Sequence, residues 1–129
     1  MQNAKEDAAF KAPVDIHRRT FAFAVRIVKL CRHLEAKPGV GRTLSRQLLR
    51  AGTSIGANVE EAQSGTSKAD FINKVAIALK EARETDYWLR LLQAAQVLPA
   101  ERLARLNDEA QQLKRILAAI IVSAKNGRK

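Results

Sequence analysis

The chain has 129 residues, of which 47% are hydrophobic and 28% are charged, and its formal net charge at pH 7 is +10. These values predict one folded domain, and the longest apolar run, residues 116–122, is too short to cross a bilayer. The single cysteine, Cys31, excludes an intramolecular disulfide, and the N-terminus lacks the apolar core of a signal peptide. We therefore expect a cytoplasmic protein with no membrane partner.

The first two predicted helices end at helix-breaking residues. The first runs from about Asp15, which we read as its N-cap, to Ala36, and it stops before Pro38. The second covers about residues 42–63 and stops at the following Ser-Gly pair. Each of these helices is long enough to cross a small domain from end to end.

The third helix is predicted to begin at Ser67, because Ser67 and Asp70 have the spacing of a capping box, and to continue to about Val97. Pro99 suits the first turn of the fourth helix. The apolar residues of this last helix alternate in steps of three and four, as in the packed seam of a bundle. They are Leu103, Leu106, Ala110, Leu113, Leu117, Ile120 and Ala124.

Short connections between four long amphipathic helices predict an all-α, antiparallel up-down-up-down four-helix bundle. We expect this bundle to span residues 14–125. A flexible N-terminal arm, residues 1–13, is expected before it, and a flexible basic tail, residues 126–129, after it.

The second helix combines glycines with a polar face. Gly52 and Gly56 each cost about 1 kcal/mol relative to alanine in a helix, so they predict the close approach of another helix. Ser54, Asn58 and Glu61 share one face at spacings of four and three. This face suits either a ligand site or a hydrogen-bonded network between helices. We favour the network, because an unpaired buried polar group costs about 1–3 kcal/mol.

The third and fourth helices are apolar over more than the single stripe that a bundle core requires. Burial of this surplus against other subunits predicts a homo-oligomer, and a bulky monomeric core is the alternative. The residues expected at the interface are Ile72, Leu79, Trp88 and Ile121.

A run of residues in the second and third helices is specific as a family marker. It comprises Leu44, Gln47, Leu48, Arg50, Ala51, Ser54-Ile55-Gly56-Ala57-Asn58-Val59 and Glu61, and, after Ser67, Asp70-Phe71, Ile77-Ala78, Lys80-Glu81-Ala82, Glu84-Thr85 and Tyr87-Trp88-Leu89. Over about residues 14–125 the chain resembles the four-helix-bundle family named for proteins encoded in intervening sequences of bacterial 23S rRNA genes. It is also similar in fold to the accessory variability protein of diversity-generating retroelements.

The resemblance implies a ring with five-fold symmetry, often a homopentamer. It also implies an association with RNA. Because the retroelement relative is associated with a reverse transcriptase, such an enzyme is one kind of protein partner that the resemblance implies. It attaches no catalytic residues to the fold.

The positive charge is the main indication of function, because a strongly basic domain attracts polyanions. Two helices carry basic rows that we read as phosphate contacts, with a solvated face as the alternative. The residues are Arg18, Arg26, Lys29 and Arg32 in the first helix and Arg42, Arg46 and Arg50 in the second. Aromatic residues are not interleaved with them, which favours contacts to the backbone and shape of structured RNA over base stacking.

Catalytic and metal-binding patterns are missing from the sequence. His17 and His33 are too far apart to share a metal on one helix, and there is no Glu-x-x-His motif. The acidic cluster in the third helix is read as ion pairing, including Asp86 with Arg90. We expect a non-enzymatic, pentameric ring without metal or cofactor that binds nucleic acid, with RNA favoured. The alternative is a protein-interaction scaffold with no direct nucleic-acid role.

Overall fold

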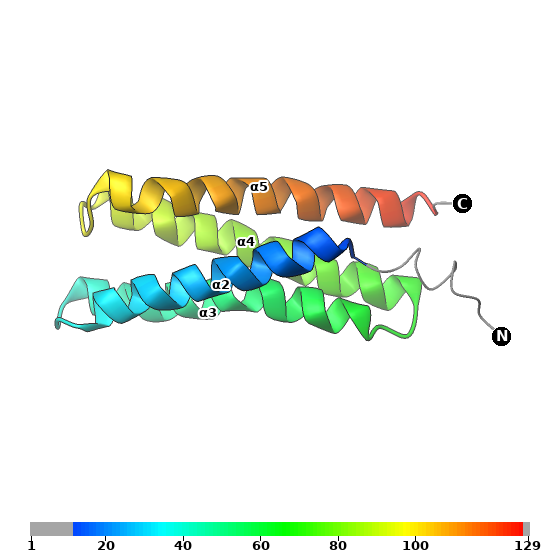
Figure 1. Ribbon diagram of the computed structural model, residues 1–129, viewed down its shortest axis with the longest axis horizontal. Coiled ribbons are helices and arrows are strands. Elements are labelled where there is room, and N and C mark those ends of the chain that lie inside the picture. The colour runs from blue at the N-terminus through cyan, green and yellow to red at the C-terminus, as the bar shows by residue number, and fades with distance from the viewer. Residues whose placement is uncertain (1–11, 128–129) are drawn as a thin grey trace.

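The computed structural model describes residues 12–127, which form four helices and no strand. The helices are α2 (Val14–Glu35), α3 (Val40–Gln63), α4 (Lys68–Ala94) and α5 (Ala100–Lys125). Figure 1 shows consecutive helices running in opposite directions, so that the start of α2 and the end of α5 lie at the same end. The prediction of an all-α, antiparallel four-helix bundle is confirmed.

Helix ends follow the local sequence where a capping residue is present. The Ser67 hydroxyl accepts a hydrogen bond from the Asp70 amide at 3.0 Å, as the capping-box spacing predicts. Asp15 is not the N-cap of α2, because Pro13 occupies that position. Asp15 instead lies in the first turn of α2. Its negative charge interacts favourably there with the positive end of the helix dipole.

Helix α4 ends at Ala94, earlier than the predicted Val97, because the backbone turns left-handed at Gln96 with a φ of 60°. The amide of Val97 donates a hydrogen bond to the carbonyl oxygen of Leu92 at 3.0 Å. The amide of Gln96 donates one to the carbonyl oxygen of Gln93, also at 3.0 Å. These two bonds form a Schellman motif, which usually has glycine at the left-handed position. Glutamine in that place gives no stop signal in the sequence.

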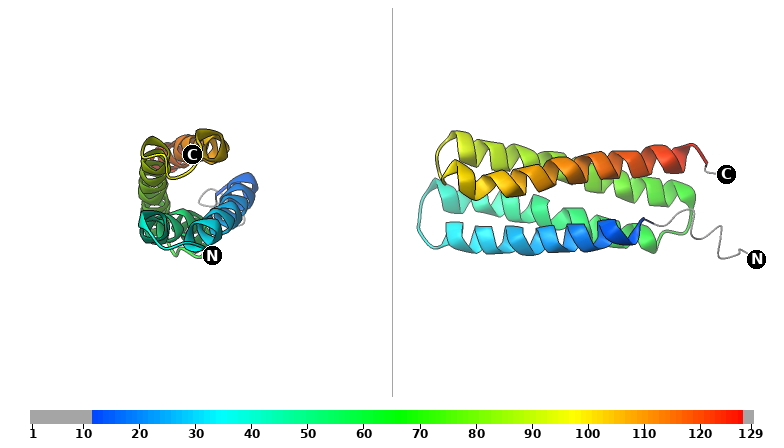
Figure 2. Two further views of the ribbon diagram at one scale, coloured as in Figure 1. Left: turned by 90° about the vertical axis from the view of Figure 1, so that its left-hand side faces the viewer. Right: turned by 45° about the horizontal axis from the view of Figure 1, so that its top comes forward.

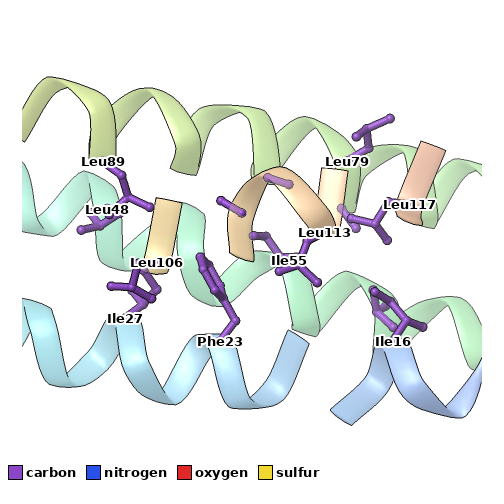
Figure 3. Packing of buried hydrophobic residues seen from close by; sticks show 14 of the residues in the cluster. Ile16, Phe23, Ile27, Leu48, Ile55, Leu79, Leu89, Leu106, Leu113 and Leu117 are labelled. Carbon is purple, nitrogen blue, oxygen red and sulfur yellow. The ribbon is translucent and has the colours of Figure 1, made fainter. Parts of the chain in front are cut away.

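The hydrophobic core runs along the bundle and takes residues from all four helices (Figure 3). Figure 3 labels Phe23 and Ile27 of α2, Ile55 of α3, Leu89 of α4 and Leu113 of α5 among them. The predicted seam of α5 is buried except at Ile120, which is half-buried. Ile120 borders an apolar groove of about 400 Å³. The groove is lined by residues of α5, by Pro13 at the start of α2 and by Phe71 of α4.

Helices α2 and α3 approach closely at the two glycines of α3. A Cβ atom at position 52 would lie 2.8 Å from Cγ2 of Ile27, and one at position 56 would lie 3.3 Å from the carbonyl oxygen of Thr20. Real Cβ contacts are almost never as short as the first of these. The predicted close approach of a second helix is therefore confirmed, and α2 is that helix.

The seam between α2 and α5 is packed much less extensively than the other three neighbouring pairs. Figure 2, in its end-on view, shows the four helices in an open arrangement with α2 and α5 on either side of the gap. The core is still closed from solvent at this seam, because Phe23 and Ile27 of α2 and Leu103 of α5 are fully buried members of one hydrophobic cluster.

The predicted arm and tail lie mostly outside the described residues, which exclude 1–11 and 128–129. Ala12, however, was assigned to the arm and is buried, and its amide donates to Oε1 of Gln63 at 2.7 Å. The packed bundle therefore begins at Ala12, before the predicted boundary. Between residues 12 and 127, no helix is both long enough and apolar enough to span a bilayer.

Candidate nucleic-acid interface

The four basic residues predicted in the first helix all lie on the exposed side of α2. Arg18, Arg26, Lys29 and Arg32 are exposed, and none of them forms an ion pair with an acid among residues 12–127. We call these four residues the α2 basic face. Their charges are not balanced by contacts within the described chain, so they are available to a polyanion.

Arg42 and Arg46, at the start of α3, are engaged with the end of α2. Arg42 donates to the carbonyl oxygen of Glu35 through Nε at 3.1 Å and through Nη2 at 3.0 Å. The carboxylate of Glu35 lies 3.8 Å from each of the two arginines and accepts a hydrogen bond from Ser45 at 3.1 Å. These contacts hold the connection between α2 and α3 and balance part of the positive charge.

Arg50 joins α3 to α4 rather than standing alone. Its guanidinium lies 3.2 Å from Oε1 of Glu81 and also contacts the carboxylate of Glu84. The indole of Trp88 donates to the same Glu84 carboxylate at 3.0 Å. The predicted basic row of α3 is thus largely a set of inter-helix ion pairs, and a role in phosphate binding stays a prediction for these residues.

The polar face of α3 forms its hydrogen bonds within its own helix. The Ser54 hydroxyl donates to the carbonyl of Arg50 at 2.6 Å, and the Asn58 side chain donates to the carbonyl of Ser54 at 2.9 Å. Glu61 is exposed. None of the three bonds to another helix within residues 12–127, so the expected network is not formed inside one subunit. The alternative, a ligand site on this face, stays a prediction.

The residues predicted for the oligomer interface differ in exposure. Leu79 is buried in the core, while Ile72, Trp88 and Ile121 are half-buried and pack against it. Larger apolar exposure lies elsewhere, on side chains that the interface prediction omitted. These are Phe21 (69% exposed), Val25, Val28, Val40, Leu49, Tyr87 and Val122.

Asp86 is the centre of a polar cluster between α4 and α5, and it is only 4% exposed. Its carboxylate accepts hydrogen bonds from Asn107 and Gln111 at 2.7 Å, Arg90 at 3.2 Å and Lys114 at 3.4 Å. The predicted pair with Arg90 is confirmed. Because four donors surround one carboxylate, the cluster fixes the register of the two helices and leaves no oxygen free for a substrate.

Cys31 is buried, and its thiol donates to the carbonyl oxygen of Ser45 at 3.4 Å. Burial, with a smaller contribution from Glu35, raises the pKa of the Cys31 thiol to about 11, so it is not a nucleophile near neutral pH. Across residues 12–127, no three His, Cys, Asp or Glu side chains gather in a group that could hold a metal ion.

Three arginines of α5 that the sequence prediction omitted are exposed and form no ion pair with described residues: Arg102, Arg105 and Arg115. Arg102 and Arg105 lie about two turns and one turn before Glu109, on the side of α5 that faces α2. Only the bonds from Arg19 of α2 to Glu109 of α5 indicate which side of α5 faces α2, since the two helices are far apart in the sequence.

The comparisons with known proteins agree with this fold. The family model described as 23S rRNA-intervening sequence protein matches residues 13–119. The chain is also similar to a crystal structure from Bacteroides thetaiotaomicron VPI-5482, described as a protein of unknown function from the S23 ribosomal protein family. The two are 44% identical, with a TM-score of 0.77, over 82% of this chain and 97% of that chain. No match was found among curated proteins. The resemblance seen in the second and third helices is thus confirmed, and the chain belongs to the 23S rRNA-intervening sequence protein family.

Proposed function

We propose that this protein is a non-enzymatic, homo-oligomeric helical bundle that binds nucleic acid, with structured RNA favoured, through the α2 basic face. The observation that carries the proposal is the contrast between two basic rows. The arginines of α3 are paired with Glu35, Glu81 and Glu84, whereas the α2 basic face has no acidic partner within residues 12–127. The net charge of +10 adds a long-range attraction for polyanions.

The geometry of α2 suits a phosphate backbone. Arg18 and Arg32 are separated by about 21 Å along the helix, which corresponds to roughly six phosphates along one strand of a B-form duplex. A regular helix holds these charges at fixed spacing. Each phosphate that they neutralise releases counterions and so strengthens binding at low salt.

The exposed apolar side chains support self-association. Phe21, Val25 and Val28 follow one another at spacings of four and three on α2, and Leu49 is exposed on the neighbouring α3. Tyr87 is exposed on α4. Two different apolar surfaces on one subunit favour head-to-tail contacts, which close into a ring when the rotation permits. We propose a pentamer, and a monomer mass by light scattering would contradict it.

The apolar row on α2 also favours a second candidate function, an interaction scaffold. Phe21, Val25 and Val28 lie between Arg18 and Arg32, so the face also suits an apolar helix flanked by acidic residues. A reverse transcriptase or another protein would then be the partner, and RNA binding would be absent.

Fluorescence anisotropy with labelled structured RNA and duplex DNA separates these functions. The double variant R18E/K29E removes two cations of the α2 basic face. Its matched control is K80E/R83E, which makes the same charge change on exposed residues of α4 that form no ion pair among the described residues. We expect RNA binding at low salt that R18E/K29E weakens more than the control. If the wild-type protein does not bind either probe at low salt, the proposed function is wrong.

A further inference from the structure

One arginine of α2, Arg19, joins α2 to α5 by an ion pair and hydrogen bonds. Nε of Arg19 donates to Oε2 of Glu109 at 3.0 Å, and its Nη2 donates to Oε1 of Glu109 and to Oε1 of Gln112, each at 2.8 Å. The charge of Glu109 is therefore balanced by Arg19, so it repels an anion at the seam only weakly. These bonds also identify which sides of α2 and α5 face each other.

Three more arginines lie on the facing sides of these helices. Arg26 follows Arg19 by two turns on α2, and Arg105 and Arg102 precede Glu109 by about one and two turns on α5. Because the two helices are antiparallel, all three are displaced from the Arg19–Glu109 pair toward the same end of the bundle (Figure 1). Helical periodicity thus brings three cations from two helices to one stretch of the seam.

These three arginines are exposed to solvent. None forms an ion pair within residues 12–127, including with Glu101 and Asp108, the acids nearest to them on α5. The seam is also the least packed junction of the bundle. A guanidinium presents a planar fork of donors that binds a phosphate through two parallel hydrogen bonds, and several converging forks suit a phosphodiester backbone.

The position of the seam keeps it accessible in an oligomer. The exposed apolar row of Phe21, Val25 and Val28 lies toward the α3 side of α2, and Leu49 of α3 is exposed as well. Arg26 lies on the opposite flank of α2, the flank that carries Arg19. A second subunit packed on the apolar row would leave the seam arginines open to solvent.

We propose that Arg26, Arg102 and Arg105 form a phosphate-binding site across the α2–α5 seam, which takes the backbone of the bound nucleic acid. This inference rests on the proposed function and specifies where the backbone runs. The path crosses from α2 to α5 and does not follow the paired arginines of α3.

The test compares two double variants with equal charge change, R102E/R105E on α5 and the control K80E/R83E on α4. We expect R102E/R105E to weaken structured-RNA binding at least about tenfold and to lower the salt slope by about 2, while the control changes affinity less than about threefold. A single variant across the seam, R26E, should weaken binding in the same direction. Thermal unfolding checks that each variant is folded, and R26E keeps the test valid if R102E/R105E is not.

The outcomes separate the inference from the proposed function. If the wild-type protein binds RNA, but R102E/R105E and R26E bind as well as their control, the seam site is wrong and the proposed function stands. If the wild-type protein binds no RNA, the proposed function itself is wrong. If polyglutamate competes for the protein as well as RNA of equal charge, the seam recognises carboxylates as readily as phosphates, and the phosphate site is contradicted.

Discussion

Replacing Gly52 with alanine places a methyl group against α2. A Cβ atom at this position would lie 2.8 Å from Cγ2 and 2.9 Å from Cγ1 of Ile27, and both partner atoms are part of a fully buried side chain. Either the side chain of Ile27 must leave its position or the two helices must move apart. The neighbouring Gly56 provides a built-in comparison, because its nearest contact would be 3.3 Å.

The expected magnitude is the difference of two effects. Overpacking a core typically costs about 1–3 kcal/mol, and a contact as short as 2.8 Å places Gly52→Ala in the upper part of this range, at about 2–3 kcal/mol. Replacing glycine by alanine in a helix returns about 1 kcal/mol. We therefore expect Gly52→Ala to destabilise the fold by about 1–2 kcal/mol, which lowers Tm by roughly 3–8 °C. Gly56→Ala should be near neutral, within about 0.5 kcal/mol, because the cost of slight crowding against Thr20 offsets the gain in helix propensity.

Urea unfolding of the two variants measures these differences, with the slope of the transition unchanged. The pair Gly52→Ala and Ile27→Ala should be non-additive, because removing the branched side chain of Ile27 makes room for the new methyl group. A Gly52→Ala variant as stable as the wild-type protein, or more stable, would refute the view that Gly52 is present to let α2 approach.

Two further predictions concern buried groups. Asp86→Ala should lower the free energy of unfolding by about 3 kcal/mol, because it leaves Lys114 and the side-chain amides of Asn107 and Gln111 without their acceptor. Urea titrations measure this loss, and an effect below about 1 kcal/mol would contradict the prediction. The Cys31 thiol should resist a thiol reagent at pH 8 until the protein unfolds, and rapid labelling of the folded protein would be contrary to its burial. Because burial raises its pKa to about 11, the folded state holds this proton longer than the unfolded state, so its contribution to stability is present at neutral pH and is lost as the pH rises through about 11.

Local signals explain why the helices were predictable. The steps of three and four in α5 correspond to its buried side, and Ser67 caps α4 with the hydrogen bond that its spacing predicts. The glycines of α3 also gave a correct expectation, since their cost in a helix needs a compensating contact. The end of α4 was missed because Gln96, a residue without a turn preference, adopts the left-handed conformation.

The candidate site depends on contacts that a single sequence does not specify. The partners of Arg50 are on the next helix, and nothing in the spacing of α3 indicates that Glu81 and Glu84 face it. The seam arginines likewise require knowledge of which sides of α2 and α5 face each other. Helical periodicity places a residue on a face of its own helix, but the rotation of neighbouring helices decides which residue that face meets.

The most direct test of the nucleic-acid proposal is the affinity of the wild-type protein for structured RNA as a function of salt concentration. If the four residues of the α2 basic face contact phosphates, log K should fall linearly with log salt with a slope of about −3 or steeper. A protein that shows no binding at about 50 mM salt, or an affinity independent of salt, would contradict recognition of the phosphate backbone.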